Sequence, residues 1–257
     1  MADAQETVTL KVRRQDGPDG QAQPYWQSFK VPYVRNMNVI SALQQVQRNA
    51  VDAEGKTAPA VQWDCNCLEE VCGACTMNIN GRARQACSAL IDDPTVGRNI
   101  TLEPMEKFPV VRDLVVDRTR IFDNLKKVKA WVQIDGTHDL GPGPRYSEQT
   151  QDWRYKLSEC MSCGCCMEAC PQFLKGGTFQ GAAIFGQVLL FNSHPSGKLN
   201  AAERTRATMG VGGLSECGNA QNCVEVCPKH IPLTDAIAQL GREQTKQMFK
   251  DLLGVRG

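Results

Sequence analysis

Residues 67–75 read Cys-Leu-Glu-Glu-Val-Cys-Gly-Ala-Cys, and a further cysteine follows after eleven intervening residues. This Cys-x4-Cys-x2-Cys…Cys spacing is typical of the plant-type [2Fe–2S] site. The small residues Gly73 and Ala74 leave room for backbone N–H groups to approach the cluster sulfurs. The spacing predicts a [2Fe–2S] cluster in a β-grasp domain, ligated by Cys67, Cys72, Cys75 and Cys87.

The sequence on either side of this loop predicts a small α+β domain. Thr7 to Arg13 alternates polar and apolar residues, and a Gly/Pro/Asp cluster at 16–20 separates it from Tyr25 to Val31, which is typical of a β-hairpin. A second hairpin is expected at Asn80-Gly81. Asn38 can cap a helix whose apolar face comprises Val39, Leu43, Val46 and Ala50.

The second half of the chain is expected to be mostly helical, because the strand signals fade beyond residue 109. One helical face is predicted from Leu114, Ile121, Leu125 and Val128, and further helices over Gly181 to Phe191, Ala202 to Met209 and Thr234 to Leu253. A Gly/Pro loop is expected from Asp139 to Pro144. We therefore predict a [2Fe–2S] ferredoxin-like domain over 1–108 and a helical, bacterial-ferredoxin-like domain over 109–257.

A second group of cysteines, at 160–171, follows the bacterial ferredoxin pattern Cys-x2-Cys-x2-Cys-x3-Cys-Pro. The fourth cysteine of that pattern ligates the other cluster of a two-cluster pair, so a partner run is required. Residues 217–228 supply it as Cys-x5-Cys-x3-Cys-Pro. The match is complete apart from Ala220, which stands where the pattern has a second cysteine.

Exchange of the fourth cysteines assigns the remaining ligands to two sets. The full set of four thiolates, suited to [4Fe–4S], comprises Cys160, Cys163, Cys166 and Cys227. The other set comprises Cys170, Cys217 and Cys223. Because an alanine cannot coordinate iron, the vacant corner at Ala220 favours a [3Fe–4S] cluster in this second set.

Two of the 13 cysteines, Cys65 and Cys165, lie beside predicted ligands but outside these spacings. We interpret each as a buried thiol or as a residue that contacts a cluster ligand, although Cys65 could replace Cys67 as a ligand. Structural zinc is the alternative for the whole set, since paired Cys-x2-Cys elements also bind zinc. The x4-x2 loop and the interleaved Cys-Pro runs favour clusters over zinc.

Composition and charge limit the classes of function. A net charge of +1 without a basic block argues against a nucleic-acid partner. No stretch approaches the roughly 20 apolar residues of a spanning helix, and the N-terminus has no signal-like core, so we expect a soluble chain in a reducing, cytoplasmic setting. The sequence lacks a phosphate loop, a nucleophile with a base and a dinucleotide fingerprint, so we expect it to conduct electrons for a catalytic partner.

Four stretches together resemble the iron–sulfur subunit family of succinate dehydrogenase (quinone) and fumarate reductase. They are residues 67–75, Phe108-Pro109-Val110-Val111-Arg112-Asp113-Leu114, Cys160 to Pro171, and Cys217 to Lys229. The resemblance implies that a flavoprotein subunit with covalently bound FAD oxidises succinate to fumarate. Electrons then pass singly through the three clusters to a quinone at an integral cytochrome b anchor that holds haem b.

The same resemblance implies a peripheral subunit on the cytoplasmic face of the inner (plasma) membrane. Ubiquinone-reducing members carry a tryptophan pair after the first Cys-Pro and a histidine after the first cysteine of the last run, where this chain has Phe173-Leu174-Lys175 and Gly218. The stretches Trp63 to Cys75 and Asp135 to Pro144 are similar to the menaquinone-linked branch with a dihaem anchor, so menaquinone is expected. The reverse activity, quinol:fumarate reduction, stays open because hydrogen bonds and burial set the cluster potentials.

Overall fold

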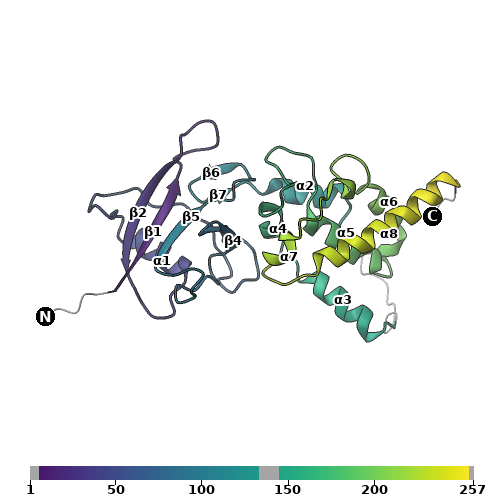
Figure 1. Cartoon of the computed structure of the whole chain (residues 1–257), viewed down its shortest axis with the longest axis horizontal. Helices are drawn as coiled ribbons and strands as arrows, with labels where there is room; N and C mark the ends of the chain where they lie inside the picture. Colours follow the sequence, from purple (N-terminus) through teal and green to yellow (C-terminus); the bar gives the residue numbers. More distant parts are fainter. Residues whose placement is uncertain (1–5, 133–144, 255–257) are drawn as a thin grey trace. The chain divides into compact units, whose positions relative to one another are not determined.

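The computed structural model describes residues 6–132 and 145–254 (Figure 1). Contacts divide the chain into two compact units, Met1–Arg118 with Cys163–Glu168, and Thr119–Ser162 with Ala169–Gly257. Within the described ranges every strand belongs to the first unit, while the second unit consists of helices and loops. The predicted order of an α+β domain followed by a helical domain is therefore confirmed.

The first unit is built on a five-stranded sheet with the order β2-β1-β5-β3-β4. β1 pairs antiparallel with β2 and β3 with β4, which confirms both predicted hairpins. At the second turn Asn80 and Gly81 have φ values of 51° and 77°, a left-handed conformation that these two residue types adopt readily. The strands are β1 (Thr7–Arg14), β2 (Tyr25–Pro32), β3 (Thr76–Ile79), β4 (Arg82–Gln85) and β5 (Asn99–Glu103).

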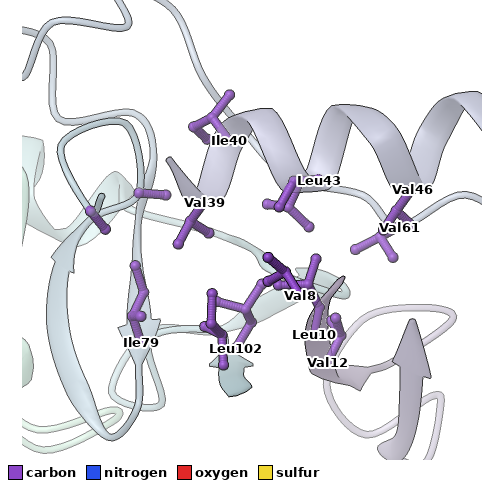
Figure 2. Close-up of a cluster of buried hydrophobic side chains, with 14 of the residues drawn as sticks. Val8, Leu10, Val12, Val39, Ile40, Leu43, Val46, Val61, Ile79 and Leu102 are labelled. Carbon is purple, nitrogen blue, oxygen red and sulfur yellow. The ribbon is translucent and has the colours of Figure 1, made fainter. Parts of the chain in front are cut away.

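Helix α1 (Val39–Arg48) covers one face of this sheet and confirms the predicted helix. Its N-terminus is capped as expected, because the Ser41 N–H donates to Asn38 Oδ1 at 2.8 Å. Figure 2 shows Val39 and Leu43 of α1 pointing toward the apolar side chains of the strands. Alternation along β1 turns Val8, Leu10 and Val12 into this core, and each is fully buried.

Residues 110–116 depart from the prediction. β6 (Val110–Arg112) and β7 (Val115–Val116) form a two-stranded antiparallel sheet, so strands do occur beyond residue 109. Leu114 lies in the turn between them, and placing it on a helical face was wrong. The cause is long-range: Asp113, at φ 47°, accepts hydrogen bonds from Arg14 Nε and from the N–H groups of Gln15 and Gln62. The spacing of apolar residues around Asp113 carries no information about hydrogen-bond partners that lie about 50 to 100 residues away in the sequence.

The second unit packs its helices around α5, the most apolar of them. α5 contacts α3, α6 and α8, and the predicted helices over 181–191, 202–209 and 234–253 are confirmed as α5, α6 and α8. The elements are α2 (Thr119–Lys127), α3 (Glu148–Ser158), α5 (Ala182–Ser193), η1 (Gly197–Asn200), α6 (Ala201–Arg206), η2 (Leu214–Glu216), α7 (Asn222–Glu225) and α8 (Leu233–Leu252). The remaining helix, α4 (Cys165–Glu168), belongs to the first unit.

The loop predicted over Asp139 to Pro144 lies outside the described residues. Among the helices of the described part of the chain, none combines the length and the apolar character that crossing a membrane requires.

Candidate metal centres

The loop that precedes β3 wraps its backbone around the sulfur of Cys67. The N–H groups of Val71 and Cys72 each donate to Cys67 Sγ at 3.3 Å, and the Ala74 N–H donates to Cys72 Sγ at 3.4 Å. In iron–sulfur proteins, N–H···S hydrogen bonds of this kind orient the cysteine ligands and tune the reduction potential of the cluster. Backbone donors, of which the Glu69 N–H is the strongest and those of Val71 and Cys72 follow, lower the pKa of Cys67 to about 7.

This wrapping depends on unusual backbone angles. Leu68, Glu70 and Gly73 have φ values of 63°, 57° and 71°, which turn successive N–H groups toward the inside of the loop. The Arg118 guanidinium then holds the loop by donating to the carbonyl oxygens of Gly73 at 2.5 Å and Ala74 at 3.1 Å. The loop is thus shaped to present N–H donors to sulfur.

The other two predicted [2Fe–2S] ligands are brought together by the β3–β4 hairpin. Cys75 directly precedes β3 and Cys87 follows β4, and the Ala86 N–H donates to the Cys75 carbonyl oxygen at 3.1 Å. Both thiols are buried, and burial raises the pKa of Cys75 to about 12. A thiolate at such a site requires positive charge nearby, which iron would supply.

Cys65 is exposed, so its interpretation as a buried thiol was wrong, and it differs from Cys67 in its surroundings. Its pKa is raised, first by desolvation and then by the neighbouring Asp64 carboxylate, whereas backbone donors lower that of Cys67. The described contacts therefore support the choice of Cys67 as the ligand.

We expect Cys65→Ser to leave the paramagnetic signal of the reduced [2Fe–2S] cluster in place, and Cys67→Ser to abolish or strongly alter it. Serine removes the thiolate in both variants, so the pair is matched in chemistry and differs only in position. Electron paramagnetic resonance of the dithionite-reduced protein measures the outcome. Loss of the signal in Cys65→Ser with retention in Cys67→Ser would reverse the assignment.

Two of the predicted [4Fe–4S] ligands, Cys163 and Cys166, lie in the first unit, on the segment Cys163–Glu168. The Glu168 carboxylate is buried and anchors this segment by accepting hydrogen bonds from the N–H groups of Glu106 at 2.8 Å and Lys107 at 3.1 Å. The pKa of Cys163 is lowered, chiefly by a hydrogen bond from the Cys165 thiol. The unassigned Cys165 is fully buried, as expected for a packing thiol near a cluster.

The other two predicted ligands of this set, Cys160 and Cys227, are in the second unit. Cys160 is half-buried, while Cys227 is buried and its sulfur accepts the Ile231 N–H at 3.4 Å. The set of four therefore stays a prediction, and three of its members, Cys163, Cys166 and Cys227, are buried.

The three thiols of the last set line one pocket in the second unit, and Ala220 lines the same pocket. Burial raises the pKa of Cys223 to about 11, and the nearby Cys170 and Cys217 raise it further. Asn219 and Gln221, on either side of Ala220, have φ values of 52° and 64°, so the chain reverses sharply there. Nothing else that lines this described pocket is a thiol, carboxylate or imidazole.

The donor chemistry in both units fits iron–sulfur clusters, which are held by cysteine thiolates and tuned by hydrogen bonds to sulfur. Within 6–132 and 145–254, no group of three or more His, Cys, Asp or Glu side chains is arranged to hold a single metal ion.

Three polar residues beside these thiols were not anticipated from the sequence: Gln85, Arg118 and Glu168. Each acts on residues that lie far from it along the chain. Glu168 lies within the cysteine run at 160–171, but at a position that the spacing pattern leaves unspecified. Gln85 alone gives a weak local signal, because it occupies an inward-facing position of β4 where an apolar residue is usual.

Comparisons with known proteins agree with this arrangement. Residues 9–123 match the family of the 2Fe-2S iron-sulfur cluster binding domain, and residues 156–231 match the 4Fe-4S dicluster domain. The succinate dehydrogenase iron-sulfur subunit of Bacillus subtilis (strain 168) is 54% identical over 250 residues, which is 97% of each chain. The fumarate reductase iron-sulfur subunit of Wolinella succinogenes is 29% identical over 238 residues, which is 92% of this chain and 96% of that protein.

A solved structure has the same fold. A chain of the Mycobacterium smegmatis Sdh1 complex in the apo form matches with a TM-score of 0.74 at 23% identity, covering 96% of this chain and 98% of that chain. With 54% identity to a curated relative over almost its full length, this chain belongs to the family of succinate dehydrogenase iron–sulfur subunits.

Proposed function

We propose that this chain carries electrons, one at a time, from a flavoprotein subunit that oxidises succinate to a quinone in the membrane. The family and the two cluster-binding domains make the chain an electron-transfer subunit of an oxidoreductase. The observation that carries the proposal is the presence, in one chain, of a wrapped thiol loop in the first unit and a three-thiol pocket in the second.

The first centre in the proposal is a [2Fe–2S] cluster on Cys67, Cys72, Cys75 and Cys87. Its support is the set of N–H donors aimed at Cys67 Sγ and Cys72 Sγ. These donors favour the thiolate form before any iron is bound, and they stabilise negative charge on the site when an electron arrives.

The second centre in the proposal is a [4Fe–4S] cluster on Cys160, Cys163, Cys166 and Cys227, which rests on the interleaved Cys-Pro spacing. The third is a [3Fe–4S] cluster on Cys170, Cys217 and Cys223. Its support is that Ala220 lines the three-thiol pocket where the pattern calls for a fourth thiolate. When bound, the clusters supply centres that accept and release single electrons.

The residues of the chain set the conditions under which these centres work. Burial of Cys75 and Cys223 limits the access of water to the proposed clusters, and the backbone N–H groups and the Arg118 guanidinium would stabilise the added negative charge. The vacant corner at Ala220 makes this centre a different cluster type, which is one of the factors that set the reduction potential, and we expect it to be the more easily reduced of the two cubane-type centres. A centre that is easily reduced suits the last position before a quinone.

The proposed partners are an FAD-containing flavoprotein and an integral cytochrome b anchor with haem b, with the chain on the cytoplasmic face of the inner membrane. The proposed quinone is menaquinone, and the residues around Gly218 support this. A Cβ at position 218 would come within 2.6 Å of Gln172 Nε2, so a histidine there would require the Gln172 side chain to move. The 54% identity to a succinate dehydrogenase subunit, against 29% to a fumarate reductase subunit, favours succinate oxidation as the direction.

We expect the chain, isolated from membranes in mild detergent, to co-purify with a flavoprotein and an integral cytochrome. The preparation should oxidise succinate, and it should reduce a menaquinone analogue in preference to a ubiquinone analogue. Subunit identification by mass spectrometry and the two parallel quinone assays measure this. Recovery of the chain as a monomer without a flavoprotein would contradict the proposed partners, and preference for the ubiquinone analogue would contradict the proposed quinone.

A further inference from the structure

The side-chain amide of Gln85 contacts two cysteine sulfurs at once. Cys75 Sγ lies 3.5 Å from Gln85 Oε1, and Cys165 Sγ lies 3.5 Å from Gln85 Nε2. Gln85 Nε2 also donates to Thr76 Oγ1 at 2.8 Å. All four residues belong to the first unit, and both Gln85 and Cys165 are fully buried. The amide is therefore held from several sides in a site that excludes water.

The two sulfurs belong to different parts of the proposed electron path. Cys75 is a proposed [2Fe–2S] ligand, and Cys165 lies between Cys163 and Cys166, the proposed [4Fe–4S] ligands of the first unit. A buried glutamine has no packing advantage over an apolar residue unless its amide is satisfied by hydrogen bonds. The contacts of Gln85 indicate that its amide is buried here because it forms hydrogen bonds with the two cysteine sulfurs.

Ligation of Cys75 decides which end of the amide faces it. A free thiol can donate to Oε1, but an iron-bound thiolate has no proton and can only accept. Rotation of the amide by half a turn brings Nε2 to Cys75 and Oε1 to Thr76 and Cys165, without a change of volume because the two ends are nearly the same size.

The neighbouring groups can accept this rotation. The Thr76 hydroxyl, which donates to the Gly73 carbonyl oxygen at 2.8 Å, can turn its hydrogen to Oε1 instead. The Gly73 oxygen then keeps the Arg118 guanidinium as its donor. The Thr76 hydroxyl alone then satisfies the oxygen end, and the Cys165 thiol keeps its hydrogen bond to Cys163.

We propose that Gln85 is a positioning residue that donates an N–H to the Cys75 thiolate and thereby raises the reduction potential of the [2Fe–2S] cluster. This inference rests on the proposed function, because it requires Cys75 to be a cluster ligand. The reduced cluster carries one more negative charge than the oxidised one, so the N–H···S bond is stronger in the reduced state and favours it. The Thr76 hydroxyl holds the amide in place.

The test is a redox titration of the purified complex, followed by the paramagnetic signal of the reduced [2Fe–2S] cluster. In Gln85→Met, which keeps an unbranched side chain without an amide, we expect reduction to become about tenfold less favourable, which is about 59 mV for one electron. Thr76→Val should shift the potential in the same direction by less, since the amide remains but loses one support. Gln15→Met is the matched control, because Gln15 is a buried glutamine of the first unit whose amide donates to the Gly17 carbonyl oxygen and not to sulfur.

An unchanged midpoint potential in Gln85→Met would overturn the inference, as would an equal shift in Gln15→Met. If Gln85→Met fails to assemble the cluster, Thr76→Val decides in its place, and an unchanged potential there overturns the inference. Failure of the proposed function looks different: the parent complex would then give no reduced [2Fe–2S] signal at all.

Discussion

Replacing Ala220 with cysteine is expected to convert part of the proposed [3Fe–4S] centre to [4Fe–4S]. Ala220 lines the pocket together with the three thiols of the last ligand set. A cysteine there restores the complete bacterial ferredoxin spacing and offers the fourth thiolate that an additional iron needs. The substitution changes the cluster type, which is one of the factors that set the reduction potential. We expect reduction of the converted centre to become at least about tenfold less favourable, which is about 59 mV for one electron.

The measurement is the loss of the three-iron signal from the oxidised protein, with a new signal from a reduced [4Fe–4S] cluster and slower quinone reduction. Ala220→Val is the matched control, because valine enlarges the side chain without offering a ligand. The [2Fe–2S] signal should be unchanged in both variants. A three-iron signal of full strength in Ala220→Cys, or its equal loss in Ala220→Val, would contradict the assignment of the vacant corner.

Asp113→Asn is expected to destabilise the first unit by about 3 kcal/mol, because it leaves a buried guanidinium without its counter-charge. Arg14 and Asp113 are both completely buried, with Arg14 Nε 2.9 Å from Asp113 Oδ1. The two oxygens of Asp113 also accept the N–H groups of Gln15 and Gln62, so this carboxylate joins β1 to two loops. Asparagine keeps the size and tolerates the left-handed backbone at φ 47°. Its NH2 group cannot accept an N–H, so the expected loss includes one of the hydrogen bonds to the carboxylate as well as the charge.

The measurement is urea-induced loss of the visible absorbance of the [2Fe–2S] cluster, with the midpoint compared between variants. Glu54→Gln is the control, since it removes the acidic partner of an exposed ion pair with Lys56 and should leave the midpoint almost unchanged. If Asp113→Asn shifts the midpoint no more than Glu54→Gln does, the buried pair does not stabilise this unit as argued.

Local features of the fold were predictable because the determining residues are adjacent in sequence. Asn38 caps α1 through a residue three positions away, and Asn80-Gly81 forms the turn between β3 and β4. Residues 110–116 were not predictable in this way. Their turn is held by Arg14 and Gln62, which no window around Asp113 contains.

The candidate sites likewise have one part that the sequence predicted and another that depends on contacts between residues far apart in the chain. The interleaved Cys-Pro pattern grouped Cys170, Cys217 and Cys223, and these three thiols line one pocket. Spacing did not predict that Cys163–Glu168 belongs to the first unit, since that placement depends on hydrogen bonds from the N–H groups at 106 and 107 to Glu168. For the same reason the amide of Gln85 beside Cys75 emerged only from the structure.

The central claim is that this chain holds three clusters, of which the last has three irons. Iron and acid-labile sulfide analysis of the purified complex, corrected for haem and combined with electron paramagnetic resonance of the oxidised form, tests it most directly. We expect about nine non-haem iron atoms per chain and a three-iron signal in the oxidised protein. About ten iron atoms with no such signal, or zinc without sulfide, would contradict the account.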